Sequence, residues 1–498
     1  MAALSVLLTT EGTYPYHKGG VSTWCDALTR ELGEVDFTLF ALTMHPYVKS
    51  SYALHRNVRK VITVPLWGIE QPEEFRFESP FSEVLDRRWR TTEEAIVTGF
   101  LPAFETFLQG IREPAGSIEA VGASLVAMHE YFQQFDYDTT LRSEQAWDAL
   151  LRTFAQPSLR TGGTPGQPAI ADLVGSLRLL YHLLQPIAVR LEPCDIAHSS
   201  AAAFCGLPCI IAKRKYGVPF LLTEHGVYVR EQYLALRRSI KSAFTRQFMC
   251  SVVSLVATLN YRHADMVAPV CAYNARWEEW WGVPRDRIRV IFNGADPERF
   301  SPAPVTPSPR PIVCNIGLIY PLKGQLDLIA AAAYVREQVP NVEFHLHGHA
   351  SDEEYYATCL QSVANKGLQD TVRFCGQTAT PWQAFRQADI VVMASVSEAF
   401  PYSIIEAMLT GAAVVATDVG GVREALADAG VVVPPRQPRE LAAALVALLH
   451  APARRRELGE AARERAVRLF TVQTFAAAYR LAYQDLHSRS VSPLAQAS

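Results

Sequence analysis

The sequence predicts an α/β protein made of two doubly wound domains, each with a parallel sheet covered by helices. Three observations lead to this prediction. Short runs rich in β-branched residues alternate with helical patterns in both halves of the chain. A proline-rich segment separates the halves, and 498 residues exceed what one ordinary core accommodates. We therefore assign residues 1–300 to an N-terminal domain and residues 312–470 to a C-terminal domain.

The N-terminal domain is predicted to open with a strand, a glycine-bearing loop and a helix. The apolar run from Leu4 to Thr10 has the length of a strand, and a helical pattern from Val21 to Leu32 follows Gly19 and Gly20. This order opens a βαβ unit. Further strands are predicted at Phe37–Leu42, Val61–Leu66, Asp195–Ser200, Pro219–Glu224, Met266–Val270 and Ile288–Phe292.

A helical insertion is predicted to interrupt this domain over residues 70–191, approximately. Its apolar residues recur with the helical period in Glu94–Phe107, Ile118–Phe135 and Ala171–Leu191. One segment, Ser158–Gln167, is rich in Gly, Pro and Thr and is predicted to be a loop. We expect the insertion to belong to the first domain rather than to fold independently.

A linker is predicted at residues 301–311, where five prolines in eleven residues exclude a helix or a central strand. The second domain then repeats strand and helix, and a helix over residues 471–487 is expected to pack back on the N-terminal domain. Strands are predicted at Ile312–Ile316, Val342–Leu346, Val372–Cys375, Ile390–Met393, Ala413–Ala416 and Val431–Val433. Ligands of such sheets bind at the carboxyl ends of the strands.

The composition excludes several classes of protein. The net charge of −3 and the lack of a basic run argue against nucleic acid as a partner. We expect no signal peptide and no membrane span, because no basic n-region or long apolar stretch is present. The nine cysteines predict buried free thiols in a reducing compartment. We therefore expect a cytoplasmic protein, with attachment to the inner face of the cell membrane through a partner as the alternative.

Two carboxylates eight residues apart, Glu398 and Glu406, form the strongest chemical signal. A predicted strand ends just before Glu398, and a helix is predicted to start near Ser403, a residue type that favours the N-cap. The N–H groups and positive dipole end of such a helix suit a phosphate. The alternative is a pair of ordinary exposed glutamates.

This Glu-x7-Glu stretch, together with the segment from Gly411 to Val422, resembles the signature of glycosyltransferase family 4. The resemblance implies the GT-B fold of two Rossmann-like domains and retaining transfer of a hexose from a nucleotide-sugar without a metal or cofactor. It also implies that Glu406 binds the donor ribose and that Glu398 is a catalytic residue beside the hexose. The remaining donor contacts that it implies come from Phe400, Pro401, Tyr402 and Ser403.

The N-terminal half carries matching features. Gly12 and the stretch from Tyr14 through Lys18 to Gly20 resemble the glycine-rich loop of the family, in which Gly19 and Gly20 approach the diphosphate. His225 follows a predicted strand, where the family places a catalytic histidine in the cleft; the alternative is a structural hydrogen bond. Asn293-Gly294 resembles a family turn and is also a turn dipeptide by itself.

A narrower resemblance concerns the Pel-type (PelF) exopolysaccharide glycosyltransferases. It rests on Thr-Glu-His-Gly-x-Tyr-x-Arg-Glu from Thr223, on Glu-Gly-Thr-Tyr-Pro-Tyr from Glu11, on Glu-Ala-Phe-Pro-Tyr from Glu398 and on the long helical insertion. It implies a UDP-sugar donor, an exopolysaccharide or glycoconjugate acceptor and a partner protein in a membrane complex.

One departure from the family lies between Gly317 and Gly324. Lys323 is present, but Leu318 stands where the family carries an arginine that neutralises the diphosphate. Three accounts remain open. Another cation substitutes, with Lys18, Arg230 and Arg373 as candidates; the donor is unusual; or the chain is a non-catalytic subunit of a polysaccharide-secretion complex. A nucleotide-sugar epimerase of the same architecture is a further alternative.

Three weaker patterns are expected not to carry chemistry. His345, His347 and His349 alternate as some metal ligands do, but the family has a plain strand there, so no metal is predicted. The Asp136-Tyr137-Asp138 pattern lies in the helical insertion and predicts solvated charge. The tryptophans at 277, 280 and 281 are predicted to fill a core or an interface, with sugar stacking as the alternative.

Overall fold

The chain folds into two α/β units. This computed structural model describes residues 3–68, 80–113, 116–154, 168–304 and 308–495. The first unit contains Met1–Pro269, Trp277–Arg289 and Arg480–Ser498, and the second contains Val270–Arg276 and Val290–Tyr479. Each unit is built on a six-stranded sheet in which neighbouring strands run parallel, so the predicted pair of doubly wound sheets is confirmed. The change from the first unit to the second at Val290 precedes the proline-rich segment 301–311.

The first sheet has the strand order β3-β2-β1-β4-β5-β6. The order reverses between β1 and β4, and in a parallel sheet ligands bind at the carboxyl ends beside such a point. The strands are β1 Leu4–Glu11, β2 Val35–Thr43, β3 Val58–Pro65, β4 Ile196–Ser199, β5 Phe220–Glu224 and β6 Met266–Pro269. Because helices cover both faces, the middle of β1 is buried from Val6 to Thr10 on successive residues.

The prediction of a strand at Ile288–Phe292 is wrong. Ile288 makes one isolated parallel bridge with Val267, and the chain then leaves the sheet as it passes into the second unit at Val290. The apolar residues of this segment satisfy the strand pattern, but they serve a connection. One aromatic ring of the segment, Phe292, stacks on Phe400 at 5.2 Å.

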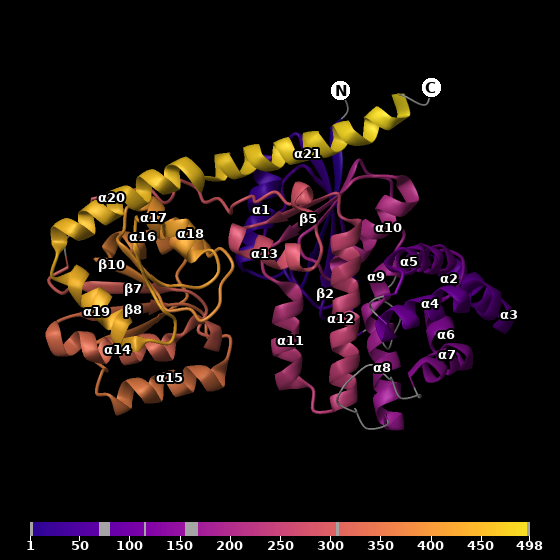
Figure 1. Cartoon of the computed structure of the whole chain (residues 1–498), viewed down its shortest axis with the longest axis horizontal. Helices are drawn as coiled ribbons and strands as arrows, with labels where there is room; N and C mark the ends of the chain where they lie inside the picture. Colours follow the sequence, from indigo (N-terminus) through magenta and orange to yellow (C-terminus); the bar gives the residue numbers. More distant parts are fainter. Residues whose placement is uncertain (1–2, 69–79, 114–115, 155–167, 305–307, 496–498) are drawn as a thin grey trace. The chain divides into compact units, whose positions relative to one another are not determined.

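The predicted insertion consists of helices beside the first sheet (Figure 1). They are α2 Phe81–Arg90, α3 Glu93–Ala95, the π-helical turn Ile96–Phe100, α4 Leu101–Arg112, α5 Ile118–Phe132, α6 Tyr137–Leu141, α7 Glu144–Phe154, α8 Ile170–Leu183 and α9 Gln185–Ala188. Buried aromatic rings such as Phe100 and Phe104, 4.9 Å apart, join one hydrophobic cluster with Phe40 of the sheet. The loop predicted at Ser158–Gln167 lies outside the described residues.

The other helices of the first unit flank its sheet. They are α1 Gly20–Glu31, α10 Leu207–Tyr216, α11 Tyr228–Ser239 and α12 Ala243–His263. A further helix, α13 Ala272–Trp280, is divided between the units, with residues 272–276 in the second and residues 277–280 in the first. The last helix, α21 Val472–Ala495, enters the first unit from Arg480 onward. There Arg480 pairs with Glu34 at 2.6 Å, and Tyr483 bonds to Nδ1 of His198 on β4 at 2.7 Å.

The second sheet has the order β12-β11-β10-β7-β8-β9, and all six strands predicted for it are confirmed. They are β7 Ile312–Ile316, β8 Glu343–His347, β9 Val372–Gly376, β10 Ile390–Met393, β11 Val414–Thr417 and β12 Val431–Val433. One face is covered by α14 Gln325–Gln338, α15 Glu353–Asn365 and α19 Pro438–Leu449. The other face is covered by α16 Pro381–Gln387, α17 Tyr402–Leu409, α18 Val422–Leu426 and part of α20 Pro452–Leu469 (Figure 1).

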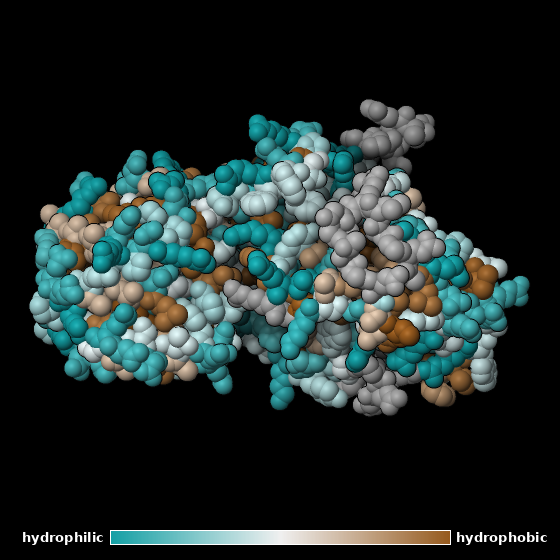
Figure 2. All heavy atoms as spheres, turned by 60° about the horizontal axis from the view of Figure 1, so that its bottom comes forward, coloured by the Kyte–Doolittle hydropathy of each residue, from teal (hydrophilic) through white to brown (hydrophobic). Residues whose placement is uncertain are grey.

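The surface seen in Figure 2 is mostly hydrophilic, with hydrophobic side chains scattered over it. Within the described ranges, no helix has both the length and the apolar character needed to cross a bilayer. All nine cysteines are free, but the prediction that they are buried holds for only part of them. Six are buried, Cys194 and Cys250 are half-buried, and Cys375 is exposed.

Candidate functional site

In the second unit, the loops that follow the adjacent strands β7 and β10 bring a lysine and a glutamate together. Nζ of Lys323 lies 2.5 Å from Oε1 of Glu398, and the hydroxyl of Ser395 donates to the same oxygen at 2.7 Å. The Glu398 side chain is 11% exposed and that of Lys323 is 30% exposed. The pair is therefore mostly protected from solvent, but a ligand can still reach Lys323. Sequence reasoning predicted Lys323 and Glu398 but missed Ser395.

Two glycines determine where the Glu398 loop lies. Gly420 has a φ of 57°, in the left-handed region, and a Cβ there would collide with the carbonyl oxygen of Glu398. Gly421 donates its N–H to the carbonyl of Ala399 at 2.6 Å, and a Cβ there would lie 2.7 Å from the Cβ of Cys271. The Gly-Gly pair therefore lets two backbone segments meet without side chains between them.

The helix that carries Glu406, α17, begins at Tyr402, close to the predicted start near Ser403. Its N-cap is Pro401 and no side chain caps it, so the prediction of Ser403 as the N-cap is wrong. Proline suits this position because its φ is preset and it lacks an N–H group. The backbone N–H groups of Tyr402 and Ser403 fall in the first turn, where an α-helix has no internal acceptors for them.

Glu406 lies on the second turn of α17 and is partly buried. Burial raises the pKa of its carboxyl to about 7, and the positive charge of Arg299 opposes that shift. The guanidinium of Arg299 in turn lies over the ring of Trp382, 4.3 Å from its centre. Sequence reasoning did not identify Arg299, which lies over 100 positions before Glu406.

Asn293 has a structural role in this unit. It is buried, and its Nδ2 donates to the carbonyl of Phe400 at 2.9 Å. A Cβ on the next residue, Gly294, would lie 2.5 Å from the carbonyl oxygen of Thr471. The Asn-Gly pair therefore supports the residue just before the start of α17 and allows close approach to the start of α21.

Arg373 does not replace the arginine that is missing at Leu318. Leu318 is 46% exposed, and its backbone carbonyl accepts a bond from Gln325 at 2.8 Å. Arg373 lies on the edge strand β9, where it pairs with Glu343 of β8 at 3.2 Å. The other two candidate cations, Lys18 and Arg230, belong to the first unit, where Lys18 is exposed and Arg230 half-buried.

In the first unit, Gly19 and Gly20 lie at the start of α1, after the carboxyl end of β1. Gly19 is the N-cap, and its φ of 169° is an extended conformation that any residue can adopt. A Cβ added at Gly19 would meet no atom of the described residues within 4 Å. The fold itself thus does not require glycine here, and the space in front of the helix is open.

His225 directly follows β5, and its ring meets Trp24 of α1 edge-on, with 4.8 Å between centres. Burial lowers the pKa of His225 to about 3, so the ring is neutral at physiological pH. The ring of Trp24 also meets His198 edge-on, 5.4 Å away, and the two nitrogens of His198 bond to Tyr483 and Thr223. The indole therefore packs against both histidines.

The residues around His225 explain the rest of its motif. A Cβ on Gly226 would collide with the carboxylate of Glu231. The hydroxyl of Tyr228 donates to Glu11 at the end of β1, 3.4 Å away, and burial raises the pKa of Glu11. Sequence reasoning did not select Glu11, the last residue of β1, or Tyr228, the first residue of α11.

Glu224 lies inside the first unit rather than at its surface. Its two oxygens accept bonds from the hydroxyl of Tyr261 at 2.6 and 2.7 Å. Burial raises the pKa of Glu224 and of the neighbouring Glu278 on α13. Burial of this pair therefore favours the protonated form of its carboxyl groups.

Two of the three weaker patterns have structural explanations. Asp136 caps α6 by accepting from the N–H of Thr139 at 2.8 Å, and Asp138 accepts from the hydroxyl of Tyr181. Both aspartates are buried, so the prediction of solvated charge is wrong. The rings of Trp280 and Trp281 meet edge-on at 5.2 Å, but Trp280 is 72% exposed, so a core position is wrong for this tryptophan. The third pattern, the alternating histidines, is taken up below.

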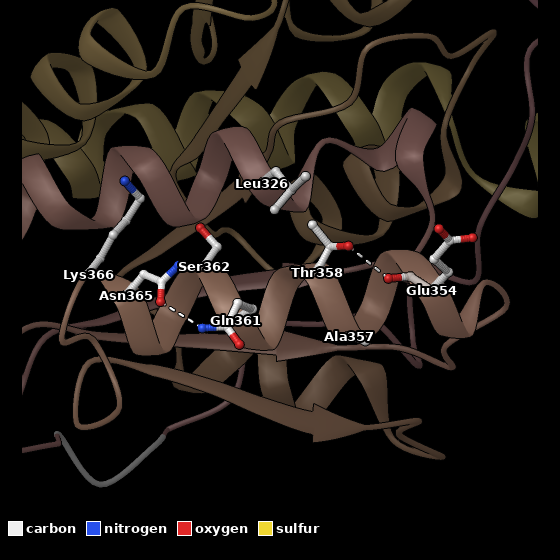
Figure 3. A pocket seen from close by; sticks show the side chains of 8 residues that line it. All are labelled: Leu326, Glu354, Ala357, Thr358, Gln361, Ser362, Asn365 and Lys366. Atoms are coloured by element: carbon white, nitrogen blue, oxygen red, sulfur yellow. Dashed lines mark hydrogen bonds between the residues drawn. The ribbon is translucent and has the colours of Figure 1, made fainter.

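A surface hollow on the second unit lies away from these groups. Figure 3 shows it between α14 and α15, lined by Leu326 and by residues of α15 and the turn after it. Three of its polar side chains are engaged locally: Thr358 donates to the carbonyl of Glu354, and Gln361 bonds to Asn365. None of the residues predicted for the site is among its eight lining residues.

Similarity to known proteins agrees with this division of the chain. Residues 4–286 match the family described as "Domain of unknown function (DUF3492)", and residues 296–465 match "Glycosyl transferases group 1". The D-inositol 3-phosphate glycosyltransferase 2 of Catenulispora acidiphila is 29% identical over 57% of this chain and 68% of its own length. Other curated relatives match over 58%, 51% and 50% of their own lengths.

Solved structures share the fold. Sucrose-phosphate synthase from Thermosynechococcus elongatus has a TM-score of 0.62 at 18% identity and covers 98% of this chain and 100% of its own. HepE from Anabaena in complex with UDP has a TM-score of 0.60 at 16% identity, over 97% of this chain and 100% of its own. The predicted GT-B architecture of two Rossmann-like domains is confirmed. The chain belongs to the family described as a domain of unknown function, DUF3492, and carries a glycosyltransferase group 1 domain over residues 296–465.

Proposed function

We propose that this protein transfers a hexose from a nucleotide-sugar to an acceptor with retention at the anomeric carbon, and that the transfer requires no metal ion. The observation that carries the proposal is the pair of Lys323 and Glu398 beside the uncapped start of α17. The glycosyl transferases group 1 match includes all of these residues.

The second unit offers the groups that a donor needs. Lys323 and the N–H groups of Tyr402 and Ser403 supply positive potential for a diphosphate. Glu406, on the second turn of the same helix, is the proposed ligand of the ribose hydroxyls. Phe400 and Pro401 shape the backbone before the helix, and Asn293 supports it through the carbonyl of Phe400.

The first unit offers an open helix start and a neutral imidazole. Gly19 and Gly20 are exposed at the start of α1, which no side chain caps, and Lys18 next to them is also exposed. His225 is neutral, so it can donate a hydrogen bond to a sugar hydroxyl without bringing a positive charge. We propose that Gly19 and Gly20 contact the donor diphosphate and that His225 contacts the transferred sugar.

Bond cleavage in such a transfer develops positive charge on the sugar and negative charge on the leaving phosphate. Lys323 and the helix start stabilise the negative charge, and the carboxylate of Glu398 faces the opposite charge on the sugar. No step requires a covalent intermediate on the protein. The main contribution of the chain is then placement of the reactants and fixed electrostatics.

The donor base that we propose is uridine, because of the Pel-type resemblance, and the acceptor is an exopolysaccharide or another glycoconjugate. HepE of Anabaena, which shares the fold, is named as a complex with UDP. We propose that the protein works in the cytoplasm, where nine free thiols are stable, with a partner protein holding it at the membrane.

Binding of UDP, GDP, ADP and their sugar conjugates to the purified chain tests the donor site. A ligand that binds only the folded state stabilises it by about 2.7 kcal/mol at a hundredfold excess over its dissociation constant. A thermal shift with uridine ligands alone is the expected result. No shift with any nucleotide would contradict the donor site.

Leu318, in place of the expected arginine, favours a second candidate, a non-catalytic subunit that binds a nucleotide-sugar without turning it over. Product analysis separates the candidates. A transferase releases nucleoside diphosphate only with an acceptor, an epimerase converts the donor without an acceptor, and a binding subunit leaves the donor intact.

A further inference from the structure

Two histidines and a cysteine meet at the edge of the second sheet. His345 and His347 are alternate residues of β8, so both side chains point to the same face of the sheet. Cys375 lies on the neighbouring edge strand β9, where the pairing shifts register: Leu346 pairs with Phe374, but His347 pairs with Gly376. Cys375 is therefore the extra residue at this irregularity, next to the two histidines.

The three side chains are close enough to share one ion. A ring nitrogen of each histidine and the Sγ of Cys375 all lie within 4.8 Å of one another. His349, the third histidine of the alternating pattern, follows the end of β8 and is not part of this group. No metal was predicted from the sequence at the alternating histidines, whereas the structure brings two of them together with a thiol that is distant in sequence.

A carboxylate outside the group holds one of the histidines in the form that a metal needs. Oε2 of Glu343 lies 2.8 Å from Nε2 of His345, so Nε2 donates its proton and Nδ1 keeps its lone pair. Histidines that bind metals commonly donate their other N–H to a carboxylate in this way. Arg310 at 2.8 Å and Arg373 at 3.2 Å balance the charge of Glu343.

The group is also open to an ion from solvent. The His345 side chain is 22% exposed, and Cys375 is the one exposed cysteine of the nine. Two imidazoles and a thiolate are soft to borderline ligands, which suit Zn²⁺ better than Mg²⁺ or Ca²⁺. Three protein ligands and an accessible fourth position, occupied by water, complete a tetrahedral zinc site.

We propose that His345, His347 and Cys375 bind a zinc ion at the β8–β9 edge, and that this site is separate from the proposed transfer reaction. On binding, the Cys375 thiol gives its proton to solvent and its sulfur bonds to the ion, so affinity rises with pH. The residues proposed for the donor follow β7 and β10, whereas the zinc site ties β8 to the edge strand β9.

The site has a structural consequence close to the donor loop. The N–H of Gly317 donates to the carbonyl of His347 at 3.0 Å, and a Cβ on Gly348 would collide with the carbonyl oxygen of Gly317. An ion on His347 therefore stabilises the backbone against which the loop after β7 packs.

Titration of the full-length, metal-free protein with Co²⁺ and with Zn²⁺ tests the proposal. Cobalt bonded to a thiolate gives a charge-transfer absorption in the near ultraviolet that histidine ligation alone does not give. We expect this band at one equivalent of Co²⁺, and its loss when one equivalent of Zn²⁺ is added. Cys375→Ser should abolish the band, and His347→Asn should weaken affinity about tenfold or more.

Two variants serve as matched controls. Cys250→Ser removes a half-buried thiol on α12, and His349→Gln removes the neighbouring histidine that is outside the group. Both should keep the band, and circular dichroism checks that every variant is folded. A wild-type protein without a band, a band that survives Cys375→Ser, or an affinity unchanged by His347→Asn would overturn the proposal. Because the readout does not involve a nucleotide, its failure is distinguishable from failure of the proposed function.

Discussion

Nζ of Lys323 lies 2.5 Å from Oε1 of Glu398, and the two residues come from loops after adjacent strands of the second sheet. The carboxylate therefore holds the ammonium group in place while no phosphate is bound. A donor diphosphate would compete with Glu398 for Lys323, and Ser395 would keep a hydrogen bond to the carboxylate as the pair separates. The pair links the proposed donor cation to the proposed catalytic carboxylate.

Glu398→Gln tests this link. The substitution keeps the size of the side chain but removes its negative charge, so we expect turnover to fall about 100-fold while donor affinity stays within a few fold. Steady-state kinetics and nucleotide titration measure the two effects separately. Glu354→Gln, on the exposed side of α15, is the matched control and should leave both unchanged. Equal turnover in both variants would show that the charge of Glu398 has no role in the reaction.

The glycines at 19 and 420 provide a pair of tests with opposite expectations. Gly19→Ala adds a Cβ to an open space at an extended residue, so we expect unchanged stability but weaker donor binding. Gly420→Ala places a Cβ against the carbonyl of Glu398 at a left-handed residue, so we expect a loss of stability of about 1–2 kcal/mol or more. Chemical denaturation and nucleotide titration on both variants measure this. Full donor affinity in Gly19→Ala would show that the glycine has no role in binding.

The sequence predicted the parts of the site that lie on strand ends and helix starts. The strand before Glu398 and the helix that carries Glu406 follow from local patterns, whereas Lys323 was predicted from the family resemblance. The N-cap was predicted wrongly because the sequence offers two residues that favour a helix start. Ser403 is a common N-cap, but Pro401, with its preset φ, takes this position in the structure. Ile288–Phe292 has the composition of a strand, but the passage to the second unit removes it from the sheet.

Loop conformation and contacts between distant segments account for what the sequence missed. The hydrogen bond from Ser395 to Glu398, three residues later, depends on the conformation of their loop. Arg299 is one of many arginines until burial of Glu406 gives its charge a partner. The thiol of Cys375 joins His345 and His347 only through the pairing of β8 with β9. Helical and strand periodicity in the sequence predicts none of these contacts, because they depend on loop conformation and on how distant segments pack.

Leu318→Arg tests the departure from the family pattern. Leu318 is 46% exposed, so a guanidinium fits there without burial of a charge. If the missing cation limits donor binding, the variant should bind a nucleoside diphosphate about tenfold more tightly, since a charge-assisted contact contributes roughly 1.5–3 kcal/mol. Leu318→Gln is the control for side-chain size. A weaker affinity in Leu318→Arg would indicate a donor site built around leucine.

Donor affinity should depend on pH through Glu406. Burial raises the pKa of this carboxyl to about 7, so the free protein carries it mostly protonated below that pH. The ionised carboxylate of Glu406 accepts hydrogen bonds from the ribose hydroxyls better than the protonated carboxyl group does. We therefore expect nucleotide affinity to rise as the pH increases through about 7. Titrations from about pH 5.5 to about pH 8.5 measure the effect. Glu406→Gln should bind more weakly and lose this pH dependence; a dependence that persists in the variant would assign it to another group.

The buried carboxyl groups of Glu224 and Glu278 should make the stability of the protein depend on pH. Burial raises the pKa of both groups, so the folded state holds protons that the unfolded state releases above the ordinary glutamate pKa of about 4.3. A raised folded-state pKa contributes stability that is fully present below the unfolded pKa and is lost as the pH rises through the folded value. The free energy of unfolding should therefore fall from weakly acidic to alkaline pH, by about 1.4 kcal/mol per pH unit for each proton retained.

Glu278→Gln removes one of these ionisations without a change in size. We expect the variant to be more stable than the wild type at alkaline pH, with a shallower decline as the pH rises, because Glu224 then has no like charge beside it. Urea denaturation at several pH values measures the slope. Glu279→Gln is the neighbouring control, since Glu279 pairs with the exposed Arg285 at 2.9 Å and should leave the slope unchanged. If both variants decline as steeply as the wild type, the buried pair does not retain a proton, and Tyr261 must instead stabilise Glu224 as a carboxylate through its two hydrogen bonds.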